Sequence, residues 1–167
     1  MHRPETRFRI GDRPGVRVLL SCTLMPTGDE ANSGCSAERT VFERMGGAPV
    51  LKRLLQHFYA DVRQDAVLGP VFNAKIEDWP AHLEKIGSFW ARQTGAASNY
   101  AGGFAAVHLP LGLQAEHFTR WLGLWERNCR QHLDPVSADW MIARAQEIGG
   151  HLKRIVGGAA GLQIARS

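Results

Sequence analysis

A single apolar stripe over residues 48–64 constrains the fold more than any other feature of this chain. Its apolar side chains recur at spacings of three and four residues, the repeat that keeps them on one face of an α-helix. The stripe consists of Val50, Leu51, Leu54, Leu55, Phe58, Tyr59 and Val62. After residue 40, no segment of useful length shows the alternation of a β-strand. The sequence therefore predicts an all-α protein.

Three further helices are expected from the same kind of pattern. One begins at Asp78, a favourable capping residue, with Pro80 in its first turn. A long helix covers about 114–132. After the turn Leu133-Asp134-Pro135, Ser137 is expected to cap a last helix. The chain should then pack as one bundle of at least four substantial helices.

Glycine and proline mark the ends of the first helix. Gly46-Gly47 breaks the chain before it, and Leu68-Gly69-Pro70 ends it. Val71-Phe72 is expected to pack in the connection to the next helix. These glycine and proline residues therefore predict where the first helix begins and ends.

The chain is expected to form one folded domain with a segment at each end. Its 167 residues, 44% of them hydrophobic, suffice for a single core. Residues 1–40 are predicted to be a flexible extension, because residues 26–39 have a linker composition and the apolar run before Cys22 is too short for an export signal. Residues 41–157 form the helical domain, and residues 158–167 a C-terminal tail.

Charge, hydropathy and cysteine content exclude several classes of partner. The net charge of +4 is modest, and its basic residues form no stripe of the kind that binds nucleic acid. No apolar run approaches the ~18 residues of a membrane span. The three cysteines, Cys22, Cys35 and Cys129, match no metal motif, and their odd number is typical of a reducing compartment. We therefore expect a cytoplasmic protein without nucleic-acid or membrane partners.

Two histidines lie among aromatic residues. His82 lies in the segment Trp79–Trp90, and His108 follows the Gly-rich segment that starts at Tyr100. Two imidazoles that face each other across an apolar, aromatic-walled slot are what a haem pocket requires, one to ligate iron and one on the open side of the metal. A histidine on an apolar face is more often a hydrogen-bonded core residue than a ligand, so the pattern by itself leaves both interpretations open.

Three side chains are candidate hydrogen-bond donors to a gas bound at such an iron. They are the Tyr59 hydroxyl, the Trp121 indole N–H and His82. Oxygen bound to ferrous iron takes partial negative charge, and a hydrogen bond to a charged acceptor contributes about 1.5–3 kcal/mol, which slows release roughly tenfold to a hundredfold. Tyr59 as a core tyrosine and Trp121 as part of a plain core stripe are the alternatives. With two donors, the protein would be a poor carrier and a better ligand trap or redox catalyst.

Across about residues 42–156 the chain resembles a truncated haemoglobin of the third group. The segments that carry the resemblance are Phe58–Asp65, Leu68–Phe72, Trp79 with His82, Ile86–Trp90, Tyr100 with Gly102, His108-Leu109 and His117–Leu122. The resemblance implies a truncated globin fold, a shortened globin-like helical sandwich around one haem. Gly46-Gly47 departs from it, since the third group usually lacks this glycine pair, and so does the N-terminal extension.

The resemblance also implies the roles of individual residues. His108 is the proximal iron ligand of haem b, and Tyr59, His82 and Trp121 lie on the distal side, where oxygen, nitric oxide or carbon monoxide binds. The implied lining of the pocket is Phe58, Phe72, Ile86, Phe89 and Trp90. From charge alone, Arg92 and Arg120 are candidate partners of the haem carboxylates, and His117 is expected to face solvent.

Three functions are open at this point. The first is a haem globin that binds diatomic gases reversibly. The second is a redox enzyme that uses the same pocket, as a nitric oxide dioxygenase or a peroxidase-like protein, with a separate reductase as partner. The third is a haem-free helical interaction module, which an exposed aromatic patch would favour.

Overall fold

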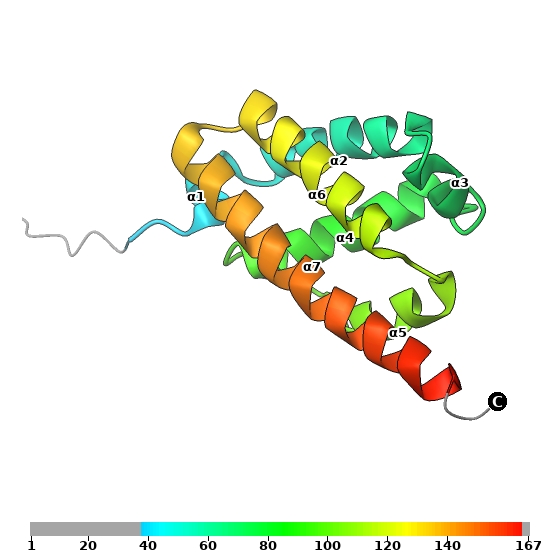
Figure 1. Ribbon diagram of the computed structural model, residues 1–167. Helices are drawn as coiled ribbons and strands as arrows, with labels where there is room; N and C mark the ends of the chain where they lie inside the picture. Colours follow the sequence, from blue (N-terminus) through cyan, green and yellow to red (C-terminus); the bar gives the residue numbers. More distant parts are fainter. Residues whose placement is uncertain (1–37, 165–167) are drawn as a thin grey trace, which may run out of the picture. The chain divides into compact units, whose positions relative to one another are not determined.

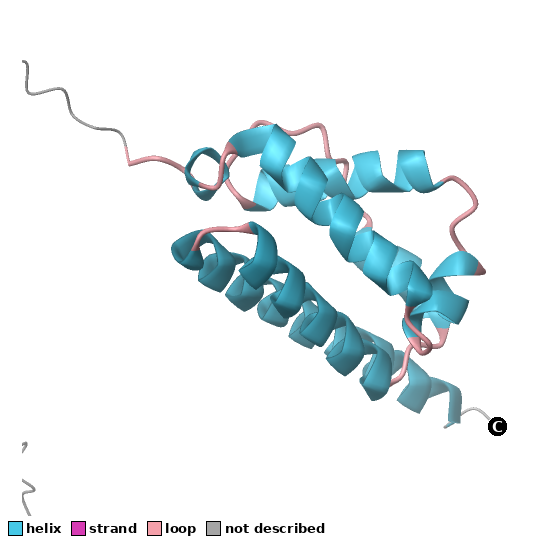
Figure 2. Ribbon diagram, turned by 90° about the horizontal axis from the view of Figure 1, so that it is seen from above, coloured by secondary structure: helices cyan, strands magenta, loops and turns pink. Residues whose placement is uncertain are grey.

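The computed structural model describes residues 38–164, with side chains as far as residue 157. All regular secondary structure within this range is helical, which confirms the all-α prediction (Figures 1 and 2). The elements are α1 (Val41–Arg44), α2 (Gly47–Gln64), α3 (Leu68–Asn73), α4 (Trp79–Gln93), α5 (Phe104–His108), the short 3-10 helix η1 (Leu109–Leu111), α6 (Ala115–His132) and α7 (Pro135–Ile164).

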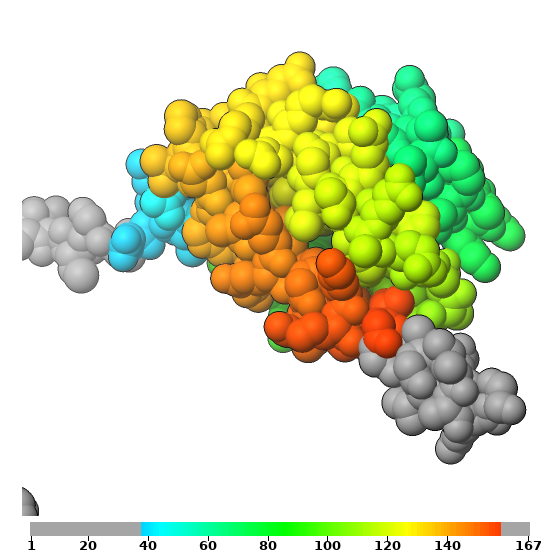
Figure 3. All heavy atoms as spheres, in the orientation of Figure 1, coloured from blue at the N-terminus to red at the C-terminus, as the bar shows by residue number. Residues whose placement is uncertain are grey.

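Helices α2 and α6 connect the rest of the bundle. α6 packs against α7 and α2, and α2 packs against α3 and α4. α6 and α7, yellow and orange in Figure 3, cover one face of the molecule. The short α5 lies beside α7. α4, α5, α6 and α7 therefore surround a common interior to which α2 and α3 also contribute.

The predicted apolar stripe forms one side of the core. Six of its seven members on α2 are buried, and Phe58 and Val62 are fully inaccessible. Trp125 and Cys129 of α6 and Met141 of α7 complete the same cluster. Burial of a large apolar side chain stabilises a fold by about 1.5–3 kcal/mol, so this cluster is the main source of cohesion between α2, α6 and α7.

The start of α7 differs from the prediction. Ser137 does not cap the helix, because the Asp134 carboxylate accepts hydrogen bonds from the backbone N–H groups of Val136 and Ser137 at 3.1 and 3.0 Å. Pro135 takes the first helical position, where its missing N–H costs nothing. Aspartate is a strong N-cap, and a proline directly after it favours a helix that begins two residues before Ser137.

The connection after α2 is also more regular than expected, since residues 68–73 form the helix α3. Gly69 permits this turn: a Cβ at that position would lie 2.8 Å from the Arg63 carbonyl oxygen. Asp65 caps α3 with one carboxylate oxygen, which accepts from the N–H groups of Val67 and Leu68, both at 3.0 Å. Its other oxygen accepts from Arg120 Nε of α6 at 2.5 Å. One carboxylate therefore connects α2, α3 and α6.

Two predictions concern the ends of the domain. α7 continues to Ile164, beyond the predicted domain end at residue 157. The predicted N-terminal extension over 1–40 lies outside the described residues, except for residues 38–40. Across the described range, no helix has the length and apolar character that crossing a membrane requires.

We expect Asp65→Asn to lower the free energy of unfolding by about 1–3 kcal/mol near neutral pH, because a buried, charge-assisted network loses its anion. Burial alone would raise the pKa of Asp65, but the Leu68 N–H and the Arg120 guanidinium outweigh it and hold that pKa below its usual value. A carboxylate whose pKa is lowered in the folded state stabilises the fold at pH values above the ordinary aspartate pKa of about 3.9. This stabilisation is lost as the pH falls through the lower pKa of the folded state.

The difference between Asp65→Asn and the wild type should therefore shrink in acid. Denaturant titrations from neutral to acidic pH measure it. Asp139→Asn is the matched control, since the Asp139 side chain pairs with Arg130 but is 65% exposed, and its removal should change stability little. A difference that stays constant down to strongly acidic pH would contradict the role assigned to the Asp65 carboxylate.

Candidate functional site

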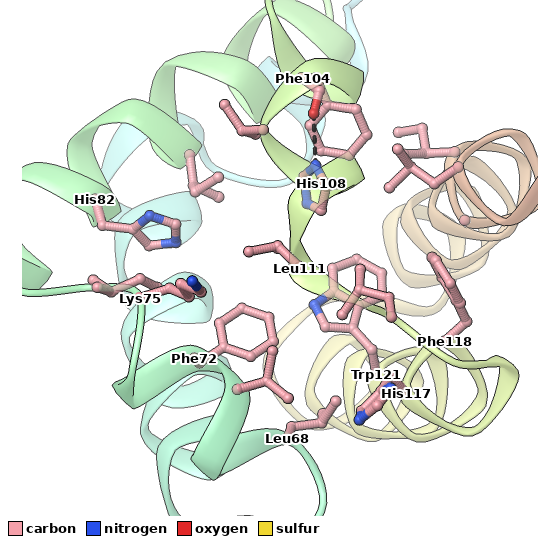
Figure 4. Close-up of a pocket in the computed structure, with 18 of the residues that line it drawn as sticks. Leu68, Phe72, Lys75, His82, Phe104, His108, Leu111, His117, Phe118 and Trp121 are labelled. Carbon is pink, nitrogen blue, oxygen red and sulfur yellow. Dashed lines mark hydrogen bonds between the residues drawn. The ribbon is translucent and has the colours of Figure 1, made fainter. Parts of the chain in front are cut away.

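A cavity of about 400 Å³ lies inside the bundle, within the range of small-molecule and cofactor sites. All helices from α2 to α7 contribute to its lining, and the lining is predominantly apolar. Six of the residues predicted for the haem pocket line it: Tyr59, Phe72, His82, Ile86, His108 and Trp121. Figure 4 shows His82 and His108 entering from different sides, His82 from α4 and His108 from α5.

His108 is held by a hydrogen bond to its own helix. Its Nδ1 lies 2.6 Å from the carbonyl oxygen of Phe104, drawn as the dashed line in Figure 4. Because a carbonyl oxygen can only accept, Nδ1 carries the proton and donates it, which leaves the lone pair on Nε2. Burial lowers the pKa of His108, and the Phe104 carbonyl offsets this only in part. The ring is therefore a neutral imidazole with one nitrogen available as a ligand.

The approach to His108 combines a Gly-rich turn with a short helix. Gly102 and Gly103, with φ of 92° and 80°, turn the chain into the short helix α5, and His108 is its last residue. This helical turn brings the Phe104 carbonyl under the imidazole, four residues back. The glycines thus supply the turn, while the helix supplies the hydrogen-bond partner.

His82 is not held in this way. Its Nε2 is buried and has no hydrogen-bond partner within the described part of the chain. Burial lowers the pKa of His82, and the positive charge of Lys85 lowers it further. A buried polar nitrogen without a partner is costly and rare in proteins, so an orphaned nitrogen in a cavity lining points to a bound group that completes it.

Tyr59 lies next to His82. The Tyr59 ring meets the His82 ring edge-on at a centroid distance of 5.3 Å and also contacts Phe72 and Trp79. Burial raises the pKa of the Tyr59 hydroxyl well above its usual value. The hydroxyl therefore keeps its proton at neutral pH and can act as a hydrogen-bond donor.

Trp121 reaches the cavity from α6. Its indole is parallel to that of Trp125, with centroids 5.5 Å apart, and Phe58 meets it edge-on at 5.3 Å. Tyr59, His82 and Trp121 thus bring an O–H and two ring nitrogens to one cavity from three helices, α2, α4 and α6.

Three of the predicted lining residues lie behind the cavity wall. Phe58, Phe89 and Trp90 are buried in the core and do not line the cavity. Phe89 stacks on Phe104, whose carbonyl binds His108, at 4.9 Å. These residues support the lining rather than form it. The resemblance implied that these rings lie at the pocket, but it does not show how deep each ring lies.

Charged and polar lining residues differ from the expectation. Lys75 and Lys85 line the cavity, and Lys75 extends toward it in Figure 4. His117, expected to face solvent, is half-buried and lines it too. The arginines proposed from charge do not: Arg120 pairs with Asp65, and Arg92 donates to the Tyr100 carbonyl oxygen at 3.2 Å. Charge alone does not show which cations line the cavity.

Apolar residues from distant parts of the chain complete the lining and were not assigned to the site from sequence. They include Leu68, Phe104, Leu111, Phe118, Ile148 and Leu152. Ile148 and Leu152 follow the inward spacing of the last helix, which marks them as core residues. Only the fold brings the end of that helix to the site.

A family profile described as bacterial-like globin matches residues 40–142. The chain belongs to the bacterial-like globin family. It is 33% identical over 111 residues to a group 3 truncated hemoglobin from Campylobacter jejuni, an alignment that covers 64% of this chain and 87% of the relative. Membership in this family implies that the protein is a haem-binding globin.

Solved structures agree with this assignment. A group III truncated hemoglobin from Campylobacter jejuni is similar to this globin with a TM-score of 0.63 and 32% identity, over 66% of this chain and 91% of that one. The group II truncated hemoglobin from Bacillus anthracis gives a TM-score of 0.62 at 22% identity, over 68% and 90% of the two chains. The predicted truncated globin fold is therefore confirmed, and the first of these relatives supports the third group.

Proposed function

We propose that this globin binds haem b through His108 and takes up oxygen, nitric oxide or carbon monoxide on the side of Tyr59, His82 and Trp121. The observation that carries the proposal is the pair of ring nitrogens in one apolar cavity. His108 Nε2 is left free by the bond from Nδ1 to Phe104, and His82 Nε2 is buried without a protein partner.

The residues present fit haem by their chemistry. When bound, haem supplies an iron atom with an open coordination position for a diatomic gas. His108 would hold the iron, because it is a neutral imidazole whose second nitrogen is oriented by a hydrogen bond, as is usual for metal-binding histidines. Lys75 and Lys85 carry the charge that the two haem carboxylates need, and Phe72 and Ile86 offer apolar contact to the ring.

The distal residues would act as donors. Tyr59 keeps its proton because burial raises its pKa, and it can donate to a gas molecule that carries partial negative charge. The indole N–H of Trp121 can only donate, and neutral His82 can donate from one nitrogen. Donors to a charged acceptor each contribute about 1.5–3 kcal/mol, so we infer slow ligand release and a role as a ligand trap rather than a carrier.

We expect His108→Ala to lose or shift the intense Soret absorption of the haem-loaded protein, because the variant lacks the nitrogen that would hold the iron. The ultraviolet–visible spectrum and a pyridine haemochrome assay measure this, with about one haem per chain expected for the wild type. Imidazole added to His108→Ala should restore the spectrum. His117→Ala is the matched control, since His117 also lines the cavity but accepts from the Gln114 N–H through Nδ1.

An unaltered spectrum in His108→Ala would exclude this residue as the ligand. A wild-type protein that takes up no haem, even with added hemin, would exclude the proposal as a whole and favour a haem-free interaction module.

Tyr59→Phe should speed oxygen dissociation roughly tenfold or more, because the variant keeps the ring and removes the donor. Stopped-flow displacement of oxygen by carbon monoxide measures the rate. Tyr100→Phe is the control, since Tyr100 also lines the cavity but its ring packs on Phe89, whereas the Tyr59 ring packs on His82. If Tyr59→Phe releases oxygen at the wild-type rate, the hydroxyl does not bind the ligand.

A redox enzyme with a separate reductase is the second candidate, favoured by the three donors that line one cavity from α2, α4 and α6. Such donors stabilise the negative charge that develops on oxygen during reduction. In a reducing cytoplasm, which the free, buried Cys129 thiol fits, nitric oxide would be consumed over many turnovers. Multiple turnovers with cell extract as the source of reductant support this function, and consumption limited to one equivalent per chain contradicts it.

A further inference from the structure

Trp125 is the central ring of a stack of three indoles. Its centroid lies 5.5 Å from that of Trp121 at an interplanar angle of 5°, and 4.6 Å from that of Trp90 at 14°. The stack extends from the cavity wall on α6 to the core face of α4. Trp125 itself is 1% exposed and does not line the cavity.

The orientation of Trp125 is fixed on every side. Its Nε1–H donates to the carbonyl oxygen of Met141 on α7 at 3.1 Å, a buried bond. Phe58 meets the Trp125 ring edge-on at 4.9 Å and 88°. Two stacked rings, one edge-on ring and one hydrogen bond leave the side chain a single orientation.

Trp121 has no such polar anchor. Among the hydrogen bonds of the described residues, none involves its indole N–H, and the ring is half-buried. Its aromatic contacts among the described residues are the parallel ring of Trp125 and the T-shaped pair with Phe58. The direction in which the Trp121 N–H points is therefore set by aromatic packing, and Trp125 supplies the larger parallel face.

We propose that Trp125 is a positioning residue, which fixes the direction of the Trp121 indole N–H into the cavity. The inference rests on the proposed function in that Trp121 donates to a bound gas there. This proposal extends the site beyond the cavity lining. A series of contacts, from the Met141 carbonyl through Trp125 to Trp121, connects α7 to the cavity side of α6. A residue that touches neither haem nor ligand would thus control ligand release.

The test compares Trp125→Phe and Trp125→Leu with Trp121→Phe and with the double variant Trp121→Phe/Trp125→Phe. Trp140→Phe is the matched control, because Trp140 is a half-buried indole of α7 that packs on the core outside the stack. The readouts are the carbon–oxygen stretching frequency of the carbon monoxide complex and the oxygen dissociation rate. The stretching frequency reports the hydrogen bond to the ligand and does not follow global stability.

We expect the Trp125 variants to shift or split the stretching band and to speed dissociation by about twofold to tenfold, the range of one lost aromatic pair. In the Trp121→Phe background, Trp125→Phe should have no further effect, because the group that it positions is gone. Unchanged frequency and rate, or a Trp125 effect that persists undiminished without the Trp121 indole, would overturn the proposal.

Nuclear magnetic resonance of the haem-free protein separates this inference from the proposed function. In the wild type, the Trp121 and Phe58 ring protons should show a strong nuclear Overhauser contact, which Trp125→Leu should weaken while Trp140→Phe leaves it intact. If the protein binds no haem, the proposed function fails, and this contact still decides the positioning. A contact retained in full in a folded Trp125→Leu protein would overturn it.

Discussion

The burial of α2 is the constraint on which the site depends. Successive residues on a helix point about 100° apart, so neighbours in the sequence face different surroundings. Phe58 is fully buried and meets Trp121 and Trp125, whereas Tyr59 turns to Phe72, Trp79 and His82. A rotation of α2 that exposed its apolar stripe would therefore also withdraw the Tyr59 hydroxyl from the cavity. Core packing and ligand chemistry are set by one helix.

Sequence periodicity predicts such a helix well, because it depends on local spacing. The first helix was expected over 48–64 and is found at Gly47–Gln64, and α6 at Ala115–His132 matches the expected 114–132. Asp78 caps α4 as predicted, through a hydrogen bond from the Ala81 N–H. Two nearby residues that could each cap the same helix are harder to rank from the sequence. Asp134 prevails over Ser137 as the cap of α7 because proline follows it directly.

Contacts between distant segments do not follow from residue spacing, and the resemblance to a known family was needed to expect one pocket. The sequence shows four polar groups on apolar faces, those of Tyr59, His82, His108 and Trp121. The fold brings all four to one cavity. Which cations accompany them is not visible, since Lys85 and Arg92 lie on the same helix and only Lys85 lines the cavity. The same holds for depth: Phe89, Trp90 and Ile86 were all expected to line the pocket, but Phe89 and Trp90 lie behind the wall that Ile86 helps to form.

The two histidines differ in a way that supports their proposed roles without reference to any relative. A metal ligand must present one nitrogen in a fixed direction, and His108 meets this condition because its Nδ1 is committed to the Phe104 carbonyl. A residue that responds to a bound gas must instead keep a nitrogen uncommitted, as His82 does with its partnerless Nε2. Exchanging the roles would leave the iron on an unanchored ring and the gas beside an anchored one. The hydrogen bonding of the two side chains thus favours His108 as the iron ligand.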